Sequence, residues 1–129
     1  LIQPYRLEMG IKLKNKKGKD LYSFWGSKIA QAIDAAAEGG VVVNLASQEY
    51  FKAVDRSSLK AQVITPTFKE YRDGTYKVIG LFAKQARGLM TDFAIKNRLT
   101  NPEVLKAFQE AQYEYSDTLS TEEEWVFVR

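Results

Sequence analysis

Residues 62–82 read QVITPTFKEYRDGTYKVIGLF, and this stretch decides the fold. β-Branched and aromatic residues on both sides of Asp73-Gly74 are typical of two strands that are joined by a two-residue turn. We therefore predict a hairpin made of residues 62–71 and 75–82. Pro66 has no amide hydrogen to donate to a neighbouring strand, so the first strand is expected at a sheet edge or at a bulge.

Helices and further short strands are expected on both sides of this hairpin. The expected helices are residues 21–38, 47–54, 84–98 and 102–109, and the other expected strands are residues 6–14, 41–45, 113–115 and 125–128. Asp20 is a good N-cap for the first helix, and Gly39-Gly40 ends it. The apolar run of residues 41–45 indicates a strand that is covered on both faces. The predicted fold class is α/β in the mixed α+β sense, with helices packed on a mixed sheet.

The length and composition describe one ordinary domain. With 129 residues, of which 45% are hydrophobic, the chain can bury a core. It contains no apolar run of eighteen residues, so we expect neither a membrane span nor a membrane partner. The first residues, Leu1 to Pro4, lack the layout of a signal peptide, and the chain does not begin with Met. We expect residues 1–129 to be a single domain or a fragment of a longer polypeptide.

Cysteine and histidine are both absent from the sequence. Their absence excludes disulfides, thiolate or imidazole zinc sites, cysteine nucleophiles and Ser-His-Asp triads within these residues. Proton transfer would depend on Glu, Asp, Lys or Tyr, and any metal on carboxylates and carbonyls. We expect no cofactor and no metal. Glu122-Glu123-Glu124 resembles a metal-binding run, but consecutive carboxylates point in different directions, which favours a solvated loop.

The charges are segregated along the chain. Residues 1–98 contain 17 Lys and Arg against 9 Asp and Glu, a balance of +8, whereas residues 101–129 contain 2 against 7, a balance of −5. A basic body with an acidic end indicates an anionic partner for the body, or an acidic tail that folds back across a basic groove.

Several segments together resemble one known family. They are Gln3–Gly10 (QPYRLEMG), Gly18–Tyr22 (GKDLY), Phe24–Gly26 (FWG), Asn44–Ser47 (NLAS), Glu49–Lys52 (EYFK), Ala83-Lys84, Ala86–Met90 (ARGLM) and Asn97–Thr100 (NRLT). In order and spacing the chain is similar to the C-terminal half of the YaaA family of bacterial peroxide-stress proteins. The family's N-terminal half, with its Ser-Pro-Ala-Lys-type motif, has no counterpart here. The resemblance implies a cytoplasmic protein that protects against hydrogen peroxide, limits free iron and binds DNA in a positively charged cleft.

The helix expected at residues 84–98 carries the sharpest prediction of a site. Lys84, Arg87, Thr91 and Arg98 lie within about 60° of one another at helical spacing. Lys84 and Arg87 fall in the expected first turn, where free amide groups suit a bound anion. Gly88 lowers helix stability by roughly 1 kcal/mol relative to Ala, which the close approach of a ligand or another backbone would explain. The alternative is a solvated charged face, with Gly88 packed against a neighbouring strand. The residues expected to face the core are Ala86, Leu89, Met90 and Phe93.

Two further groups of residues near the start of the chain are candidate anion contacts. The first is a lysine-rich arm, in which each cation would act as a point charge on a phosphate, or would simply keep an edge strand soluble. Its members are Lys12, Lys14, Lys16, Lys17 and Lys19. The second is Arg6 and Glu8, which lie on one face of the expected strand and either form an ion pair or point into a cleft with Arg87.

Asn44, Ser47 and Glu49 fall where a buried strand meets a helix N-terminus. Ligands of open α/β sheets collect at this edge, and a buried amide at position 44 needs partners. These side chains either line a cleft or form a turn and a helix cap. Trp25 has the spacing of a core residue, although an aromatic side chain there could also stack on bases.

Two hypotheses of function follow. In the first, which we favour, a basic cleft binds DNA through phosphates, with Arg6, Lys84, Arg87 and Arg98 as contacts. In the second, the chain is part of an enzyme for a nucleotide-like anion, with Glu8 or Glu49 as acid or base. A stress-response scaffold whose cleft is structural is the third possibility.

Overall fold

The computed structural model describes residues 24–129, which fall into two compact units. The first unit holds residues 24–42 and 46–62 of this range, and the second holds residues 43–45 and 63–129. The elements are α2 (Lys28–Ala37), β1 (Val41–Val43), α3 (Gln48–Phe51), η2 (Arg56–Ser58), β2 (Gln62–Arg72), β3 (Thr75–Lys77), α4 (Gly80–Lys96), η3 (Pro102–Ala107), η4 (Glu110–Gln112), β4 (Glu114–Tyr115) and β5 (Glu124–Val128).

Helix α2 dominates the first unit and is shorter than predicted. Gly26 has a φ of 51°, which lies outside the right-handed helical region, so α2 begins only at Lys28. The helix ends at Glu38 in the left-handed conformation, followed by Gly39 with a φ of 80°, as the Gly-Gly dipeptide predicts. The prediction that Trp25 lies in the core is wrong, because 43% of its surface is exposed.

A single carboxylate ties α2 to the chain that leads into β2. Asp34 accepts hydrogen bonds from the backbone amides of Lys60 and Ala61, each at 2.9 Å. These two amides precede the strand and are satisfied by a side chain rather than by the sheet. The 3-10 turn η2 packs against α2, so this bond fixes the return of the chain inside the first unit.

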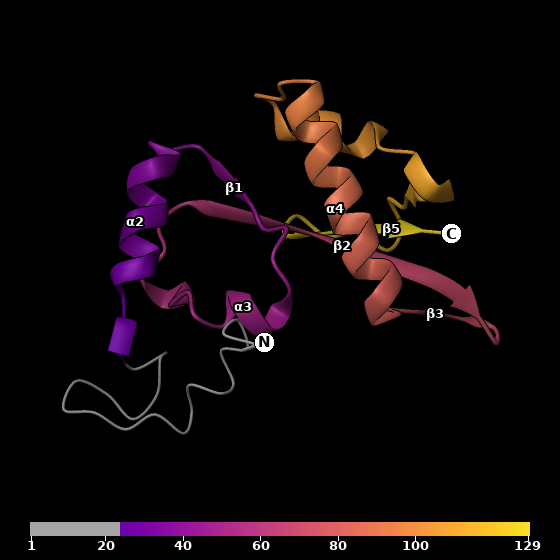
Figure 1. Ribbon diagram of the computed structural model, residues 1–129, viewed down its shortest axis with the longest axis horizontal. Helices are drawn as coiled ribbons and strands as arrows, with labels where there is room; N and C mark the ends of the chain where they lie inside the picture. The colour runs from indigo at the N-terminus through magenta and orange to yellow at the C-terminus, as the bar shows by residue number, and fades with distance from the viewer. Residues whose placement is uncertain (1–23) are drawn as a thin grey trace, which may run out of the picture. The chain divides into compact units, whose positions relative to one another are not determined.

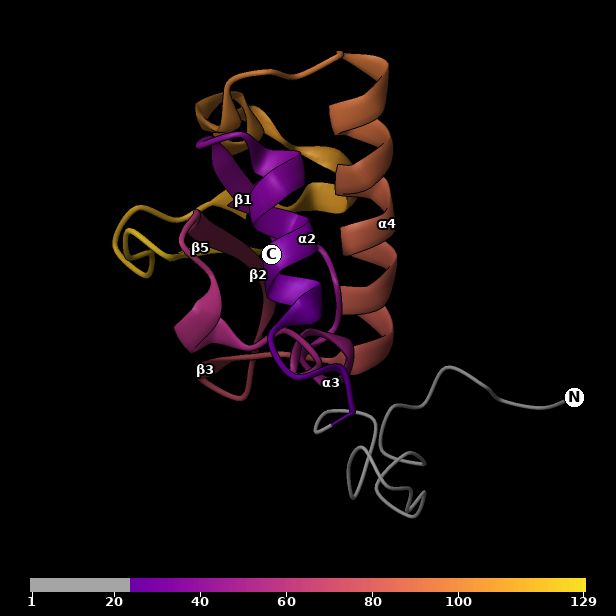
Figure 2. The same ribbon diagram turned by 90° about the vertical axis from the view of Figure 1, so that its left-hand side faces the viewer.

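The second unit is built on a mixed sheet, which confirms the predicted fold class. Its strands follow the order β1-β2-β5-β4, and β3 pairs with β2. Strands β2 and β5 are parallel, whereas β4 is antiparallel to β5. Helix α4 lies along one face of β2 and β5 (Figures 1 and 2).

The β2–β3 hairpin confirms the predicted turn. Arg72 pairs with Thr75, and the two residues between them, Asp73 and Gly74, have φ values of 52° and 80°. Positive φ at both central positions defines a type I′ turn, whose twist matches that of the strands. The second strand is shorter than predicted, because β3 ends at Lys77.

The prediction that Pro66 lies at a sheet edge or at a bulge is wrong, because β2 lies between β1 and β5 and its register with β5 runs without a break from Thr65 to Lys69. The backbone of Thr65 donates to Glu123 on the β5 side, and Asn44 donates to Ile64 on the β1 side. Because successive residues of a strand direct their amides to opposite sides, the nitrogen of Pro66 faces the β1 side. Pro66 therefore removes a donor only on the side of β1, a strand of three residues that ends at Val43.

Aromatic side chains fill the core of the second unit. The ring of Phe68 on β2 stacks on Phe127 of β5 at a centroid distance of 5.3 Å and meets Phe108 and Tyr113 edge-on. From α4 the buried residues are Ala83, Ala86 and Met90. Leu89 does not belong to this face as predicted, since 37% of its surface is exposed.

The acidic end of the chain is a structural part of the sheet rather than a tail that folds back over a groove. Strand β5 buries Trp125, Val126 and Phe127, and the preceding turns bury Leu105 and Phe108. Its carboxylates lie mainly on the outside. The helix expected at residues 102–109 is the 3-10 helix η3. Among residues 24–129, no helix has the length and apolar character that a bilayer crossing requires.

Candidate functional site: a basic hairpin and helix

Helix α4 begins earlier than the sequence predicted, and this changes the basis of the anion site. Its first residue is Gly80, so Lys84 and Arg87 lie in the second and third turns. Their backbone amides are therefore inside the helical hydrogen-bonding pattern and are not free to bind an anion. The prediction that these cations flank free amides is wrong. Their side chains remain neighbours, because residues three apart lie on the same face of a helix.

Arg87 is a half-buried cation on this face. Burial lowers the pKa of its guanidinium from the ordinary value, because a charge that leaves water loses solvation. No carboxylate of residues 24–129 forms an ion pair with it. A guanidinium that has lost part of its water and has no counter-ion among the described residues is suited to an external anion.

Arg98 does not join Lys84 and Arg87. Helix α4 ends at Lys96, and Arg98 follows with a φ of 47°, so the helical spacing does not extend to it. It also lies 14 residues after Lys84, which is about 20 Å along a helix axis. The prediction that the three cations share one helical face is therefore wrong for Arg98.

Gly88 leaves open space beside α4. A Cβ atom added at this position would meet no heavy atom within 4 Å. Neither a close backbone nor a packed strand among the described residues accounts for this glycine, so both structural explanations offered by the sequence are wrong.

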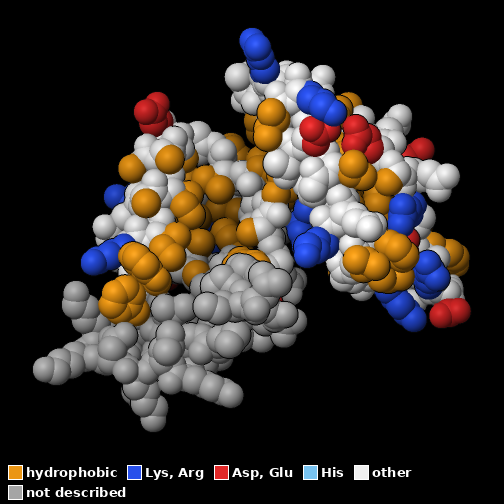
Figure 3. Space-filling view, in the orientation of Figure 1, with side chains coloured by type: hydrophobic (Ala, Val, Ile, Leu, Met, Phe, Trp, Pro, Cys, Tyr) orange, Lys and Arg blue, Asp and Glu red, His pale blue; other side chains and the backbone are white. Residues whose placement is uncertain are grey.

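The hairpin adds cations that sequence reasoning had treated only as strand residues. Lys69, Arg72 and Lys77 lie on β2 and β3, immediately before α4 in the chain. We call these three residues together with Lys84 and Arg87 the basic surface; Arg72 and Lys77 share one face of the hairpin, and Lys69 projects from the other. Figure 3 shows Lys and Arg side chains interspersed with hydrophobic ones over the hairpin and the adjacent turns of α4.

The acidic residues within this stretch are already engaged. Residues 69–87 contain five cations and two carboxylates, Glu70 and Asp73, a balance of +3. Glu70 is bound by Arg129, and Asp73 lies 3.9 Å from Lys77 in an exposed ion pair. The basic surface therefore keeps a net positive charge. The alternation of Lys, Tyr and Arg in residues 69–77 was the signal that could have revealed it.

The structure gives Asn44 and Ser47 structural partners. The Asn44 side chain is buried and donates to the Thr65 hydroxyl at 3.4 Å. Ser47 caps α3 by accepting from the Tyr50 amide, also at 3.4 Å, which confirms the predicted cap. Glu49 lies in the first turn of α3, and its Oε1 is buried without a hydrogen-bond partner among the described residues. Asn44 belongs to the second unit and the other two residues to the first.

The remaining predicted contacts lie outside the described residues. They are Arg6, Glu8, Lys12, Lys14, Lys16, Lys17 and Lys19. Their roles in DNA binding or catalysis stay predictions from the sequence.

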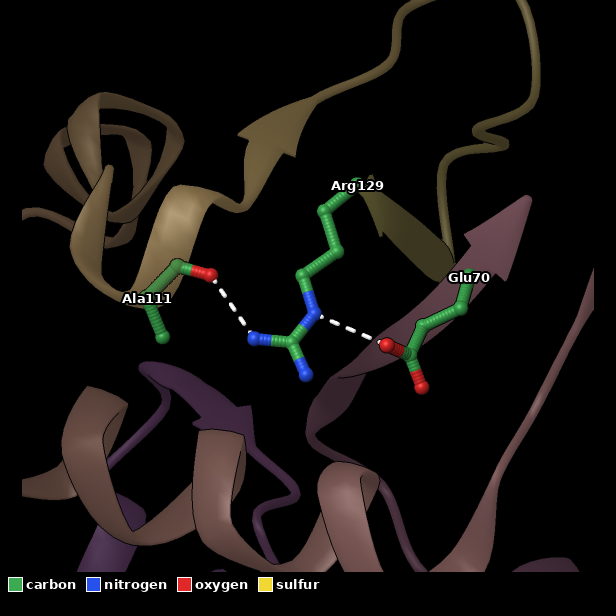
Figure 4. A network of polar contacts seen from close by, with 3 residues as sticks. All are labelled: Glu70, Ala111 and Arg129. Carbon is green, nitrogen blue, oxygen red and sulfur yellow. Dashed lines mark hydrogen bonds and ion pairs between the residues drawn. The ribbon is translucent and has the colours of Figure 1, made fainter.

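The sequence did not indicate an ionic network beneath the hairpin, in which the Glu70 carboxylate is buried and the Arg129 guanidinium is partly exposed. The Arg129 guanidinium donates from Nε to Glu70 Oε1 and from Nη1 to the carbonyl of Ala111, each at 2.9 Å (Figure 4). It also lies over the rings of Tyr113 and Phe82, 4.5 and 5.1 Å from their centroids. The residues are far apart in the sequence, so no local pattern indicates the network. It anchors the base of the hairpin to β5.

Glu122, Glu123 and Glu124 are exposed at the start of β5. Within the described part of the chain, no group of three or more acidic side chains is arranged to hold a metal ion.

Comparison with known proteins places the chain in a family. The family model described as peroxide stress protein YaaA matches residues 1–119. A UPF0246 protein of Acaryochloris marina is 57% identical over 130 residues, which cover 100% of this chain and 52% of the relative. UPF0246 proteins of Psychrobacter arcticus and Neisseria gonorrhoeae are 52% and 51% identical, again over the whole chain and over 49% and 51% of their own lengths. The chain thus spans about half the length of the curated relatives that it matches. It belongs to the peroxide stress protein YaaA family.

Proposed function

We propose that this protein binds DNA through its phosphates, with the basic surface of the hairpin and α4 as the contact, in the cytoplasmic response to peroxide. The observation that carries the proposal is the excess of cations in residues 69–87, where both carboxylates already have cationic partners. The link to free iron that the family resemblance implies belongs to the same proposal.

Binding of this kind reads charge rather than sequence. Lys69, Lys77 and Lys84 are lysines, which act on phosphates as point charges. Arg87 can bind a phosphate with two parallel hydrogen bonds. We therefore expect affinities that differ little between duplexes of unrelated sequence.

The test is the salt dependence of binding. Each phosphate contact contributes about 0.9 to the slope of log affinity against log salt concentration. Lys84→Ala and Arg87→Gln should each lower this slope by about one contact and weaken binding to all duplexes alike. Binding would be measured by fluorescence anisotropy of a labelled duplex on the whole 129-residue chain.

Lys96→Ala on the same helix is the matched control. Lys96 is exposed, but its ammonium lies 2.7 Å from Asp92, so its charge is already neutralised. This variant should keep the parent's slope. A parent affinity that does not change with salt, or equal losses in the control and in both test variants, would contradict the proposal.

The alternative enzyme hypothesis predicts a different result. A site for one nucleotide-like anion would bind one mononucleotide per chain in a saturable way. The bound mononucleotide would then displace DNA from the chain. Within the described residues its one structural support is the buried, unpartnered oxygen of Glu49. If the enzyme hypothesis holds, Glu49→Gln should abolish conversion of the nucleotide-like substrate. The slope of log DNA affinity against log salt concentration should stay unchanged.

A further inference from the structure

We propose that Tyr71 and Tyr76 form a stacking platform for unpaired nucleic-acid bases at the end of the β2–β3 hairpin. This inference rests on the proposed DNA binding and adds a partner class to it, because phosphate contacts alone do not distinguish paired from unpaired strands.

The two tyrosines are an exposed aromatic pair on one face of a two-stranded ribbon. They are direct partners in the antiparallel register, and their ring centroids lie 5.2 Å apart with the ring planes at 63°. Tyr71 is 60% exposed and Tyr76 is 42% exposed. Exposed apolar area of this size costs free energy in water, and a bound base would cover it.

The tyrosines point away from the core. Along β2 the buried residues alternate with half-buried ones, and Pro66, Phe68 and Glu70 occupy the buried side. Lys69 and Tyr71 both lie on the opposite side of the strand. They are two residues apart, which is about 7 Å along a strand. The hydrogen bonds between β2 and β5 end with the bond from the Tyr71 amide to the Arg129 carbonyl. Beyond Tyr71 the hairpin therefore continues as the two strands β2 and β3.

Cations lie on both faces of the ribbon at this pair. Lys69 shares the face of Tyr71 and Tyr76, whereas Arg72 and Lys77 project from the opposite face, because successive side chains of a strand alternate between faces. Aromatic rings beside Lys and Arg are the combination with which proteins hold single strands, since the rings stack on bases and the cations bind the backbone. A cross-strand aromatic pair also stabilises a hairpin by itself, but this role requires no cations.

The geometry favours unpaired bases over duplex. In a duplex each base face is covered by its neighbours, so side chains reach only the edges of bases. An unpaired base offers its face to a tyrosine ring, whatever the sequence. Charge complementarity favours a nucleic acid over a protein partner, because the two carboxylates of this stretch are already bound.

The experiment compares a labelled oligothymidylate of about 12 nucleotides with a duplex of equal length, on the whole chain, at low salt. Tyr71→Ala and Tyr76→Ala should each weaken single-strand binding roughly 5- to 100-fold, the range that loss of one stacked base gives. Duplex binding should stay within about twofold, because the phosphate contacts remain. The double Tyr→Phe variant retains both rings and should bind like the parent.

Tyr50→Ala is the matched control. Tyr50 is also an exposed tyrosine, at 38%, but lies on α3 outside the hairpin, and its loss should not change either affinity. Circular dichroism establishes that each variant is folded. Photo-crosslinking of a strand that carries 5-bromouracil should label the peptide with residues 71 and 76. This result does not depend on any substitution.

The outcomes separate the two proposals. If the parent binds neither probe, the proposed function fails and the stacking platform fails with it. If the parent binds both probes and the Tyr→Ala variants bind the single strand equally well, only the platform is wrong. Crosslinks confined to other peptides, or capture of a protein by the tyrosines without nucleic-acid binding, would also overturn it.

Discussion

Glu70 and Arg129 show how a charged pair becomes part of a core. The Glu70 side chain is only 8% exposed, and one of its oxygens has no hydrogen-bond partner among the described residues. The Arg129 guanidinium compensates by lying against two aromatic rings and by donating to a carbonyl as well as to the carboxylate. That carbonyl belongs to Ala111, whose φ of 53° is unfavourable for a residue with a Cβ. The network thus holds a strained turn in place.

Removal of the carboxylate should be costly. Glu70→Ala leaves the guanidinium half-buried without its counter-ion, and we expect a loss of about 2–3 kcal/mol in the free energy of unfolding. Lys77→Ala is the control, because its ion pair with Asp73 is solvent-exposed and should contribute less than about 0.5 kcal/mol. Urea denaturation measures both. Equal effects of the two substitutions would show that the buried network does not stabilise the sheet.

Substitution of Gly88 should stabilise the protein, whereas removal of the Glu70 carboxylate should destabilise it. It lies in the interior of α4 with no atom near its missing Cβ, so alanine fits without a clash. Gly88→Ala should raise the free energy of unfolding by about 0.5–1 kcal/mol, because alanine loses less backbone entropy in a helix. The midpoint of urea denaturation measures it. A lower midpoint would mean that another part of the chain occupies this space.

At the scale of elements, the sequence predicted what local chemistry determines. Asp73-Gly74 predicted the hairpin because few residue pairs adopt two successive positive φ values. Ser47 predicted a helix cap for the same local reason. The start of α4 was missed because Gly80, Leu81 and Phe82 continue the apolar pattern of the strand, and a short apolar run does not distinguish strand from helix.

Long-range pairing explains the other errors. Strand β5 lies beside β2 in parallel, with Thr65 opposite Glu124, and no turn between them indicates this. For that reason neither the interior position of Pro66 nor the Glu70–Arg129 network was predictable. The sequence indicated only part of the basic surface: the helical spacing of Lys84 and Arg87 predicted a charged face, whereas the cations of the hairpin lie within a strand pattern.

The contact between α2 and the start of β2 should depend on pH. The backbone amides of Lys60 and then Ala61 hold the pKa of Asp34 below its ordinary value of 3.8. Because the folded pKa is depressed, the stabilisation is complete above the ordinary value and is lost as the pH falls through the folded pKa. The urea midpoints of the parent and of Asp34→Asn should differ at neutral pH and converge below about pH 3.8. If the two urea midpoints differ by the same amount at neutral pH and at low pH, the ionised Asp34 carboxylate does not stabilise this contact.

At the scale of the whole molecule, positive and negative charges are concentrated in different parts of the chain. Residues 1–98 carry the positive excess, and residues 101–129 carry the negative one. The acidic part supplies the buried strand β5 and places its carboxylates outside. Under the proposed function, these exposed charges would act on bound DNA through space, over a distance of about 10 Å at moderate salt.

Substitution of the exposed residues Glu122, Glu123 and Glu124 tests this long-range electrostatic effect. Changing all three to Gln raises the formal net charge from +3 to +6, and DNA should then bind about two- to threefold more tightly at low salt. The gain should vanish as salt rises, because screening removes interactions between distant charges. The same three positions changed to Asp keep the charge and serve as the control, which should bind like the parent. Anisotropy titrations over a range of salt measure both variants. Weaker binding of the Gln variant would mean that these carboxylates contribute to the interface rather than repel the partner, and the basic surface would then not be the dominant contact.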